Sequence, residues 1–260
     1  MTLLSTNYSN ALLTLFENGR PPLSLVELGP WFSVSQVAEA QRKLPQCEIH
    51  FHASNLLTES LSAAQAIQQI QAYHAAARSP WVSAHIDLLP PGYYQLIRRL
   101  HIHLPVPAKQ MLTRRYISRV RRLKAAMDIP VILENMPSLN HKRYYYQSDP
   151  QRIKAILEQT GCDMLLDIGH ARVAASVSET DIYEYLGQFP LEKVVHMHIS
   201  GPREKDGSLV DAHEPLQEED YEILQWLLAQ KRPQILTLEY FRDATALLDQ
   251  LKRLAAIIAA

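Results

Sequence analysis

Short apolar runs alternate along the whole chain with segments whose apolar residues recur at helical spacing. Each run is short enough for a strand, and each amphipathic segment is long enough for a helix. The runs predict eight strands, at Thr2–Leu4, Leu23–Leu28, Glu48–His52, Val82–Ile86, Pro130–Glu134, Met164–Asp167, Val194–Ile199 and Ile235–Glu239. The predicted helices are Asn7–Glu17, Ser35–Leu44, Leu61–Ala77, Met111–Met127, Asp149–Thr160, Glu179–Gln188, Glu218–Ala229 and Ala244–Ala259.

This alternation predicts an α/β protein with a parallel sheet. Over 260 residues, eight units have about 32 residues each, close to a strand–loop–helix module. Right-handed crossovers then leave two architectures, an open doubly wound sheet or a closed barrel. The first strand is weak, and without it seven would remain. No linker or change in composition marks a second domain, so we expect a single domain over residues 1–260.

Two segments interrupt the rhythm, residues 87–109 and 201–219. The first contains LPPGYY and HIHLPVP, and its prolines disfavour a regular helix. The second is polar and contains GPREKDGSLVDAHEP. Both follow predicted strands, so in a barrel both would be rim loops on the carboxyl-terminal face, where active sites lie.

Carboxylates and imidazoles stand at or near the ends of the third to eighth predicted strands. Each of these residues taken alone could have a purely structural role, because buried histidines are usually hydrogen-bonded and strand-terminal aspartates often cap helices. A buried, unpaired carboxylate costs several kcal/mol, however, and several neighbouring strand ends would bear that cost together unless divalent cations neutralised them. The predicted metal ligands are His52, His85, Glu134, Asp167, His170, His198 and Glu239, with Asp211 and His213 in the second rim loop.

The spacing within this set divides it further. Asp167 and His170 lie three apart across a strand-to-loop turn, so we do not expect them to bind one metal from the same face. Asp211 and His213 lie two apart in an extended loop and can point the same way. His196 is expected one layer beneath the strand ends, in the barrel interior. Oxygen and imidazole ligands suit Zn, Mn or Fe, and the lack of thiolates nearby argues against a structural zinc site.

Composition narrows the class of protein. Apolar residues make up 47% and charged residues 20%, which describes a folded globular protein. No apolar run approaches the roughly 20 residues that span a bilayer, and the N-terminus lacks a basic region typical of signal peptides. The chain has eleven histidines and only two cysteines. Because the cysteines are so few, a disulfide framework is excluded and a cytoplasmic location is predicted. The net charge of −1 argues against broad nucleic-acid binding.

The motifs resemble the xylose isomerase-like TIM-barrel superfamily. They are VELGPW, HFHAS, SAHID, LENMP, LLDIGHA, VHMHISG, DAHEP and LEYFRD, which together run from about Leu4 to Leu251. That superfamily includes sugar isomerases and epimerases, the endonuclease IV type of abasic-site nuclease, and a multinuclear iron family. The chain is most similar to the iron enzymes of the methanobactin-biosynthesis type, which modify cysteine in ribosomal peptide precursors. The resemblance implies a (β/α)8 TIM barrel.

The resemblance also implies how the ligands divide. A first site would use His52, His85 and Glu134. A second would share Glu134 and add Asp167, His198 and Glu239. A third would use His170, Asp211 and His213. Simple sugar isomerases of the superfamily keep only the positions of Glu134, Asp167, His198 and Glu239, so the full set favours another activity.

Four functions follow from the resemblance. The leading one is a metal-dependent enzyme with two or three divalent ions, iron first and Zn or Mn as alternatives, that oxidises a cysteine-containing peptide. The second is a sugar isomerase or epimerase in which Glu134 or Glu239 moves the proton. The third is a phosphodiester hydrolase, and the last is a metal-binding scaffold without activity. For the peptide-oxidising enzyme we expect a precursor peptide and a partner subunit. We expect no association with a membrane.

A basic stretch bears on the choice of partner. Between Leu88 and Met127 there is no Asp or Glu, and nine Lys or Arg occur. They are Arg98, Arg99, Lys109, Arg114, Arg115, Arg119, Arg121, Arg122 and Lys124. This stretch could hold phosphates or an acidic leader peptide, or be the solvated face of an amphipathic helix, with about equal weight. Nucleic acid is the least expected partner, because DAHEP runs into LQEED where the nuclease pattern has a glycine-containing turn.

Overall fold

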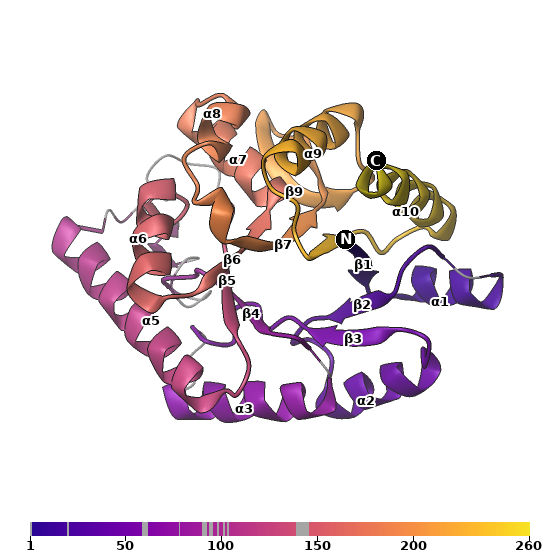
Figure 1. Ribbon diagram of the computed structural model, residues 1–260. Helices are drawn as coiled ribbons and strands as arrows, with labels where there is room; N and C mark the ends of the chain where they lie inside the picture. Colours follow the sequence, from indigo (N-terminus) through magenta and orange to yellow (C-terminus); the bar gives the residue numbers. More distant parts are fainter. Residues whose placement is uncertain are drawn as a thin grey trace.

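The computed structural model describes residues 2–19, 21–58, 62–77, 79–89, 93, 96, 97, 99, 100, 102, 104–138 and 146–260. Eight parallel strands form one sheet, and helices surround it (Figure 1). The strands are β1 (Leu3–Asn7), β2 (Leu25–Leu28), β3 (Glu48–Phe51), β4 (Val82–His85), β5 (Val131–Glu134), β6 (Asp163–Asp167), β7 (Val194–Ile199) and β10 (Ile235–Leu238). All eight predicted strands are confirmed, including the weak first one.

The sheet curls into a nearly closed barrel. The strand order is β3-β2-β1-β10-β7-β6-β5-β4, so β3 and β4 are the two ends of the sheet. They meet in a single parallel bridge between His52 and Ser83. The backbone N–H of Ala53 donates to the Ser83 carbonyl at 2.8 Å, and that of His85 donates to the Ser54 carbonyl at 2.9 Å. The predicted (β/α)8 barrel is therefore confirmed, with a short junction between β3 and β4.

The main helices follow the predicted segments closely. They are α1 (Asn10–Glu17), α2 (Val34–Lys43), α3 (Ala63–Ala76), α5 (Val106–Ala126), α6 (Pro150–Thr160), α9 (Glu218–Gln230) and α10 (Ala244–Ala259). Helix α5 begins five residues earlier than predicted, within the first expected rim loop. Pro105 is its N-cap and Pro107 lies in its first turn, where a missing N–H costs nothing. Of the rest of that loop, residues 90–92, 94, 95, 98, 101 and 103 lie outside the described residues, Arg98 among them.

One helix was not predicted. Helix α7 (Ile168–Ser178) starts directly after β6, and Asp167 caps it by accepting a hydrogen bond from the His170 N–H at 2.6 Å. The predicted strand-to-loop turn after Asp167 is therefore wrong, because the turn leads into a helix. Of the helix predicted over Glu179–Gln188, only α8 (Ile182–Leu186) forms.

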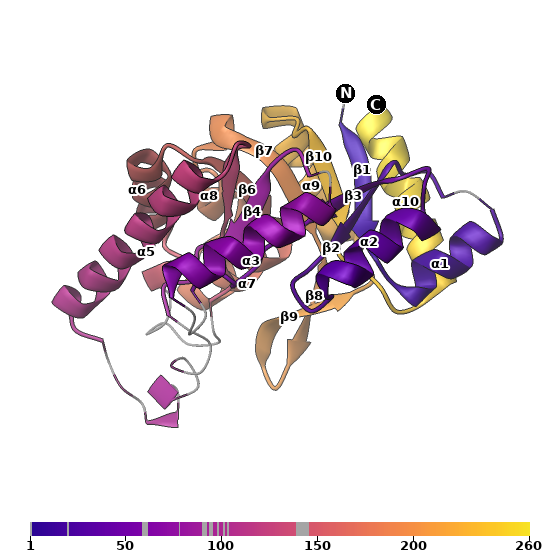
Figure 2. The same ribbon diagram turned by 90° about the horizontal axis from the view of Figure 1, so that it is seen from below.

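The second predicted rim loop is largely an antiparallel hairpin, of β8 (Gly201–Lys205) and β9 (Ser208–Glu214). Asp206 and Gly207 form its two-residue turn with φ angles of +53° and +73°, and Asp-Gly is the sequence that such turns favour. The hairpin projects from the barrel on the side of the carboxyl ends of the strands (Figure 2).

The barrel interior has an apolar layer beneath a polar one. Leu25, Trp81, Ile132, Leu165 and Ile235 form a buried apolar cluster separate from the main core, which packs between sheet and helices. Side chains two residues apart on a strand point to the same face. The residues two positions after Leu25, Ile132 and Leu165 are carboxylates. The strands thus carry the acids into the same interior, one layer nearer the rim.

Among the described residues, no helix combines the length and apolar character needed to cross a membrane.

We expect Gly201→Ala to destabilise the fold by about 1–3 kcal/mol, because an added methyl group overpacks a closed contact. A Cβ at Gly201 would stand 2.4 Å from the Glu214 carbonyl oxygen across the hairpin. Urea denaturation followed by circular dichroism measures the change. Ser208→Ala, on the same hairpin, is the control and should change stability little. Equal stability of both variants would contradict the close packing of β8 on β9.

Candidate metal centre

The nine predicted ligands form one continuous cluster at the carboxyl ends of the strands, with Glu134 at its centre. This carboxylate is buried at the end of β5. Its Oε2 lies 3.2 Å from His52 Nε2 and 3.3 Å from His85 Nε2. Its Oε1 lies 3.3 Å from His170 Nδ1. One carboxylate therefore faces histidines from β4, from α7 and from the residue after β3.

A second carboxylate, Glu239, follows β10 and also faces two sides. Its Oε1 lies 3.3 Å from His198 Nδ1, on β7. Its Oε2 lies 3.6 Å from His213 Nδ1, on the hairpin. His198 Nδ1 is also 3.9 Å from Glu134 Oε1, which joins the two carboxylates through one imidazole.

The hairpin brings Asp211 and His213 onto the cluster, with both side chains directed the same way. Asp211 Oδ2 lies 3.1 Å from His213 Nε2 and 3.4 Å from His170 Nε2. Ser200 Oγ donates to Asp211 Oδ1 at 3.4 Å. Side-chain exposure is 29% for His213 and 19% for Asp211, against 1% for Glu134, so the hairpin side is the open side of the cluster.

Asp167 is both a helix cap and a member of the cluster. Its Oδ1 accepts the His170 N–H, while its Oδ2 is buried, accepts no hydrogen bond and lies 3.8 Å from His170 Nδ1. The Asn135 side chain fixes this strand end, because it accepts from the Asp167 N–H at 2.8 Å and donates to its carbonyl at 2.9 Å. The capping and metal-binding explanations of Asp167 are therefore compatible.

Hydrogen bonds outside the cluster orient its imidazoles. His170 Nδ1 donates to the Asn135 carbonyl at 2.8 Å, which leaves Nε2 directed at Asp211. His52 Nδ1 hydrogen-bonds Ser83 Oγ at 2.8 Å, which leaves Nε2 directed at Glu134. Holding one ring nitrogen in this way prepares the other as a metal ligand.

The cluster suits divalent cations. Glu134 Oε2, Asp167 Oδ2, His198 Nδ1 and His213 Nδ1 are buried and make no hydrogen bond. In two groups, His52 with His85 and Glu134, and Glu134 with Asp167 and His198, the ligand atoms lie within 4.8 Å of one another. Unsatisfied buried polar atoms carry a free-energy cost that coordination would remove.

Charge and burial oppose each other throughout the cluster. Burial raises the pKa of Glu134, but His85 and His52 outweigh it and hold that pKa well below its ordinary value. Burial raises the pKa of Asp167 to about 7. Burial lowers the pKa of His52 to about 4. Burial also lowers the pKa of His198, but neighbouring carboxylates raise it well above the ordinary value. Such opposed shifts are typical of functional sites.

Residues 31–259 match the family described as "RiPP precursor modification enzyme MbnB/TglH/ChrH". The chain belongs to this family. Histidine and carboxylate groups of the cluster are able to hold metal ions.

Curated relatives carry the name UPF0276. One from Caulobacter vibrioides is 29% identical over 114 residues, which are 44% of this chain and 41% of that protein. One from Bordetella bronchiseptica is 28% identical over 167 residues, 60% of this chain and 57% of that protein. The chain therefore spans about two fifths to three fifths of the curated relatives it matches.

Solved structures share the fold. A D-tagatose 3-epimerase-like protein has a TM-score of 0.58 at 15% identity, covering 99% of this chain and 97% of that one. A putative xylose isomerase from Rhodospirillum rubrum has a TM-score of 0.57 at 17% identity, covering 100% and 99%. The TIM-barrel fold is thereby confirmed for this member of the MbnB/TglH/ChrH family.

Sequence reasoning missed Glu27, on β2. Its carboxylate is buried, and Oε1 lies 3.2 Å from His198 Nε2, the ring nitrogen opposite the one that faces Glu239. His196, expected in the interior, is buried below and hydrogen-bonds Thr237 Oγ1 through Nε2 at 2.8 Å. A weaker signal for Glu27 was present, because LVEL is an apolar run with one acid inside it, whereas VILE has its acid at the end.

Glu27→Ala should weaken metal binding by about 10- to 100-fold, since the variant removes the group that orients His198. Glu27→Gln keeps an acceptor for Nε2–H and should lose less. Titration of Co²⁺ or Zn²⁺ into metal-free protein, in competition with a chelating dye, gives the dissociation constant. The control is Glu48→Gln, an exposed carboxylate on the neighbouring strand β3. Unchanged affinity in Glu27→Ala would contradict the orienting role.

Metal binding should release protons at pH 7 and strengthen as pH rises towards about 9. Burial lowers the pKa of His213, but Asp211 and Glu239 raise it to about 9. Burial also lowers the pKa values of His170 and His198, but the carboxylates around these two rings raise both values well above the ordinary 6.5. These rings must lose protons to bind metal. Calorimetry in two buffers of different ionisation enthalpy counts the protons, and His213→Ala should release fewer. Affinity independent of pH between 6.5 and 9 would disprove this.

Proposed function

We propose that this enzyme binds two or three iron ions in the cluster and oxidises cysteine in a precursor peptide. The observation that carries the proposal is the third group of ligands. Asp211 and His213 on the hairpin extend the cluster beyond Glu134, Asp167, His198 and Glu239 and join it through His170. Membership of a family of precursor-modifying enzymes supports the peptide substrate.

Two carboxylates suit the bridging role in this proposal. Glu134 directs Oε2 at the His52 and His85 pair, and its Oε1 lies 3.9 Å from His198 Nδ1. A carboxylate offers two oxygens that could bind different metals. Glu239 divides its oxygens between His198 and His213 in the same manner. Iron, when bound, supplies the redox chemistry, with dioxygen as electron acceptor.

The open side of the cluster suits a peptide. His213 and Asp211 are its most exposed members, so a substrate thiol would approach from the hairpin. The ring of Phe241, 46% exposed, lies 6.1 Å from the ring of His213. An exposed aromatic residue beside the opening gives an apolar surface on which the residues flanking a cysteine would pack.

We further propose that the enzyme works in the cytoplasm, where a ribosomal precursor is made, with a partner subunit and that precursor. Genes adjacent to its own that encode a short cysteine-containing peptide and a second protein would support both partners. A purification in which the tagged enzyme brings down neither product would count against them.

The protein purified without added metal should contain iron and show its electronic absorption spectrum. Glu134→Ala should lose most of this iron, because the variant removes the oxygens shared between groups, and should lose turnover of the peptide with it. Metal analysis and the absorption spectrum measure the first effect, and mass spectrometry of the peptide measures the second. Asp128→Asn, an exposed carboxylate shortly before β5, is the control and should retain both.

Zinc alone, with no iron after anaerobic growth, would overturn the oxidative chemistry. Ketose epimerisation that survives Asp211→Ala and His213→Ala would instead establish a sugar isomerase or epimerase, since those enzymes need only the other four positions.

A further inference from the structure

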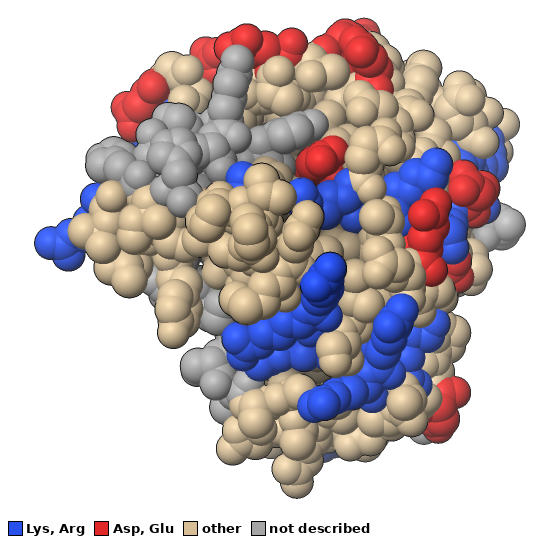
Figure 3. Space-filling view, turned by 90° about the vertical axis from the view of Figure 1, so that its left-hand side faces the viewer, with Lys and Arg blue, Asp and Glu red and all other residues tan. Residues whose placement is uncertain are grey.

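The outer face of α5 is basic. Arg114, Ser118, Arg121, Arg122 and Ala125 recur at helical spacing on one side of the helix. The helix contains seven Lys or Arg and no Asp or Glu. Figure 3 shows the basic side chains gathered over the middle of this side of the molecule, with most carboxylates towards its edges.

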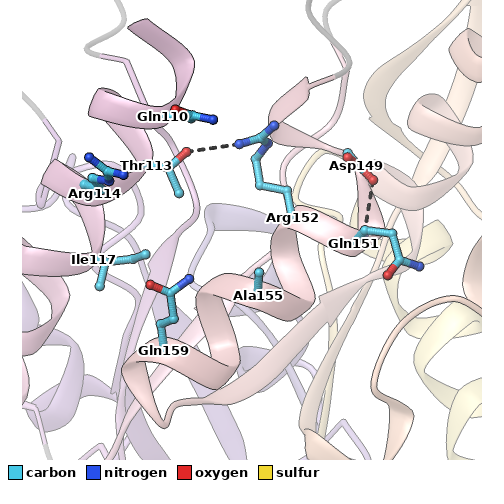
Figure 4. Close-up of a pocket in the computed structure, with 9 residues that line it drawn as sticks. All are labelled: Gln110, Thr113, Arg114, Ile117, Asp149, Gln151, Arg152, Ala155 and Gln159. Atoms are coloured by element: carbon cyan, nitrogen blue, oxygen red, sulfur yellow. Dashed lines mark hydrogen bonds between the residues drawn. The ribbon is translucent and has the colours of Figure 1, made fainter. Parts of the chain in front are cut away.

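This face borders a groove of about 530 Å³ between α5 and α6. Gln110, Arg114 and Ile117 line it from α5, and Ala155 and Gln159 from α6 (Figure 4). A second hollow, of about 360 Å³, is lined by the same Arg114, Ile117 and Gln159 and extends along α5 to Ala125. The two share three lining residues and together make one groove between the helices. Its lining is mostly polar and holds more bases than acids, with Asp149 as the acid near the amino end of α6.

Some of these charges have a structural role and others have none. Arg121 donates to the Gln159 carbonyl, at 3.2 and 2.8 Å, and Lys124 donates to the carbonyls of Thr160 and Gly161, so both satisfy the carboxyl end of α6. Arg114 and Arg122 are exposed, and no ion pair joins either to a carboxylate among the described residues.

The like charges also repel one another. Burial lowers the pKa of Arg119, and Arg115 and Arg122 lower it further. A solvated helix gains stability from acids three or four residues away from its bases, and α5 has none. A helix with seven bases and no acid of its own is suited to an anionic partner.

Helix α5 lies between the groove and the metal cluster. On the opposite face of α5, the Tyr116 O–H donates to the backbone carbonyl of His85 at 2.7 Å, so the helix packs directly on a predicted ligand. The amino end of α5 and the β8–β9 hairpin lie on the same side of the barrel (Figure 2). A chain lying in the groove would therefore run along the outside of the barrel towards the open side of the cluster.

We propose that the α5–α6 groove binds an acidic segment of the substrate peptide, outside the part that reacts. This rests on the proposed function, since it names where that substrate is held. Arg114 and Arg122 stand about 12 Å apart along the helix, which matches carboxylates about four residues apart in an extended peptide. Ile117 and Ala155 offer contacts for apolar side chains between the acids, and the glutamine amides are partners for peptide groups.

A peptide fits the groove better than nucleic acid does. None of its described lining residues is aromatic, so no base would find a stacking surface. The chain as a whole has a net charge of −1, which gives phosphate backbones little attraction away from this face.

The test is binding of a fluorescein-labelled 12-residue peptide, with Glu at every fourth position and Leu and Ser between, to the enzyme as purified with its metal. The variant Arg114→Glu with Arg122→Glu should bind it about tenfold or more weakly at low salt, with a flatter salt dependence. The variant Arg114→Lys with Arg122→Lys should bind about as the unchanged protein does. Arg42→Glu with Lys252→Glu, exposed bases on α2 and α10, is the charge-matched control.

Loss of affinity in the groove variant alone, with melting temperature and metal content unchanged, supports the proposal. Equal affinity in the groove and control variants overturns it, as does failure of the unchanged protein to bind the peptide. Tighter groove-dependent binding of a 12-nucleotide single strand would assign the groove to nucleic acid instead. A dimer in sedimentation that the groove variant dissociates would assign it to a second copy of the chain. Since binding is measured without turnover, absence of iron or of cysteine oxidation would count against the proposed function and leave this result standing.

Discussion

The constraint on which this structure depends is the burial of the Glu134 carboxylate inside the barrel. A charge with 1% of its side chain exposed requires compensation, and here imidazoles from three directions approach it within 3.3 Å. Those histidines come from or directly follow elements that are distant in sequence, so the barrel must be formed before the charge is balanced. The apolar layer beneath, with Ile132 two residues before Glu134 on the same strand, keeps water from reaching the acid from below.

The polar layer therefore lowers the stability of the metal-free fold and provides ligands for metal ions. Several of its oxygen and nitrogen atoms make no hydrogen bond within the protein, so the metal-free fold carries a cost that a bound cation would remove. Binding and stability are then linked, because a ligand that prefers the folded state stabilises it. The open hairpin side, with its partly exposed imidazole and carboxylate, is where this layer meets the substrate.

The sequence allowed the barrel strands to be predicted because each is a short apolar run, and allowed most of the cluster to be predicted because an acid or imidazole ends such a run. Glu27 escaped because its carboxylate lies within its run, followed by Leu28, and does not end it. Helix α7 follows β6 without a loop, so the change of periodicity at Asp167 predicts a turn and does not reveal the helix. The hairpin was predictable in principle from Asp206-Gly207, but a polar segment gives little periodicity from which to assign strands. The position of the groove relative to the cluster could not be predicted from the sequence. It depends on the packing of α5 on β4, where Tyr116 contacts His85.

The strand order has a consequence for biosynthesis. The first strand, β1, pairs with β2 and with β10, and β10 is the last of the eight strands along the chain. Thr6 Oγ1 donates to the Leu238 carbonyl at 2.7 Å, so the two ends of the barrel sequence are fastened side by side. While the ribosome is still making β10, the amino-terminal strands have one open edge and the cluster lacks Glu239. Assembly of the complete centre must therefore wait until β10 and Glu239 have emerged. A nascent chain arrested before β10 holds its other ligands without the residue that links β7 to the hairpin.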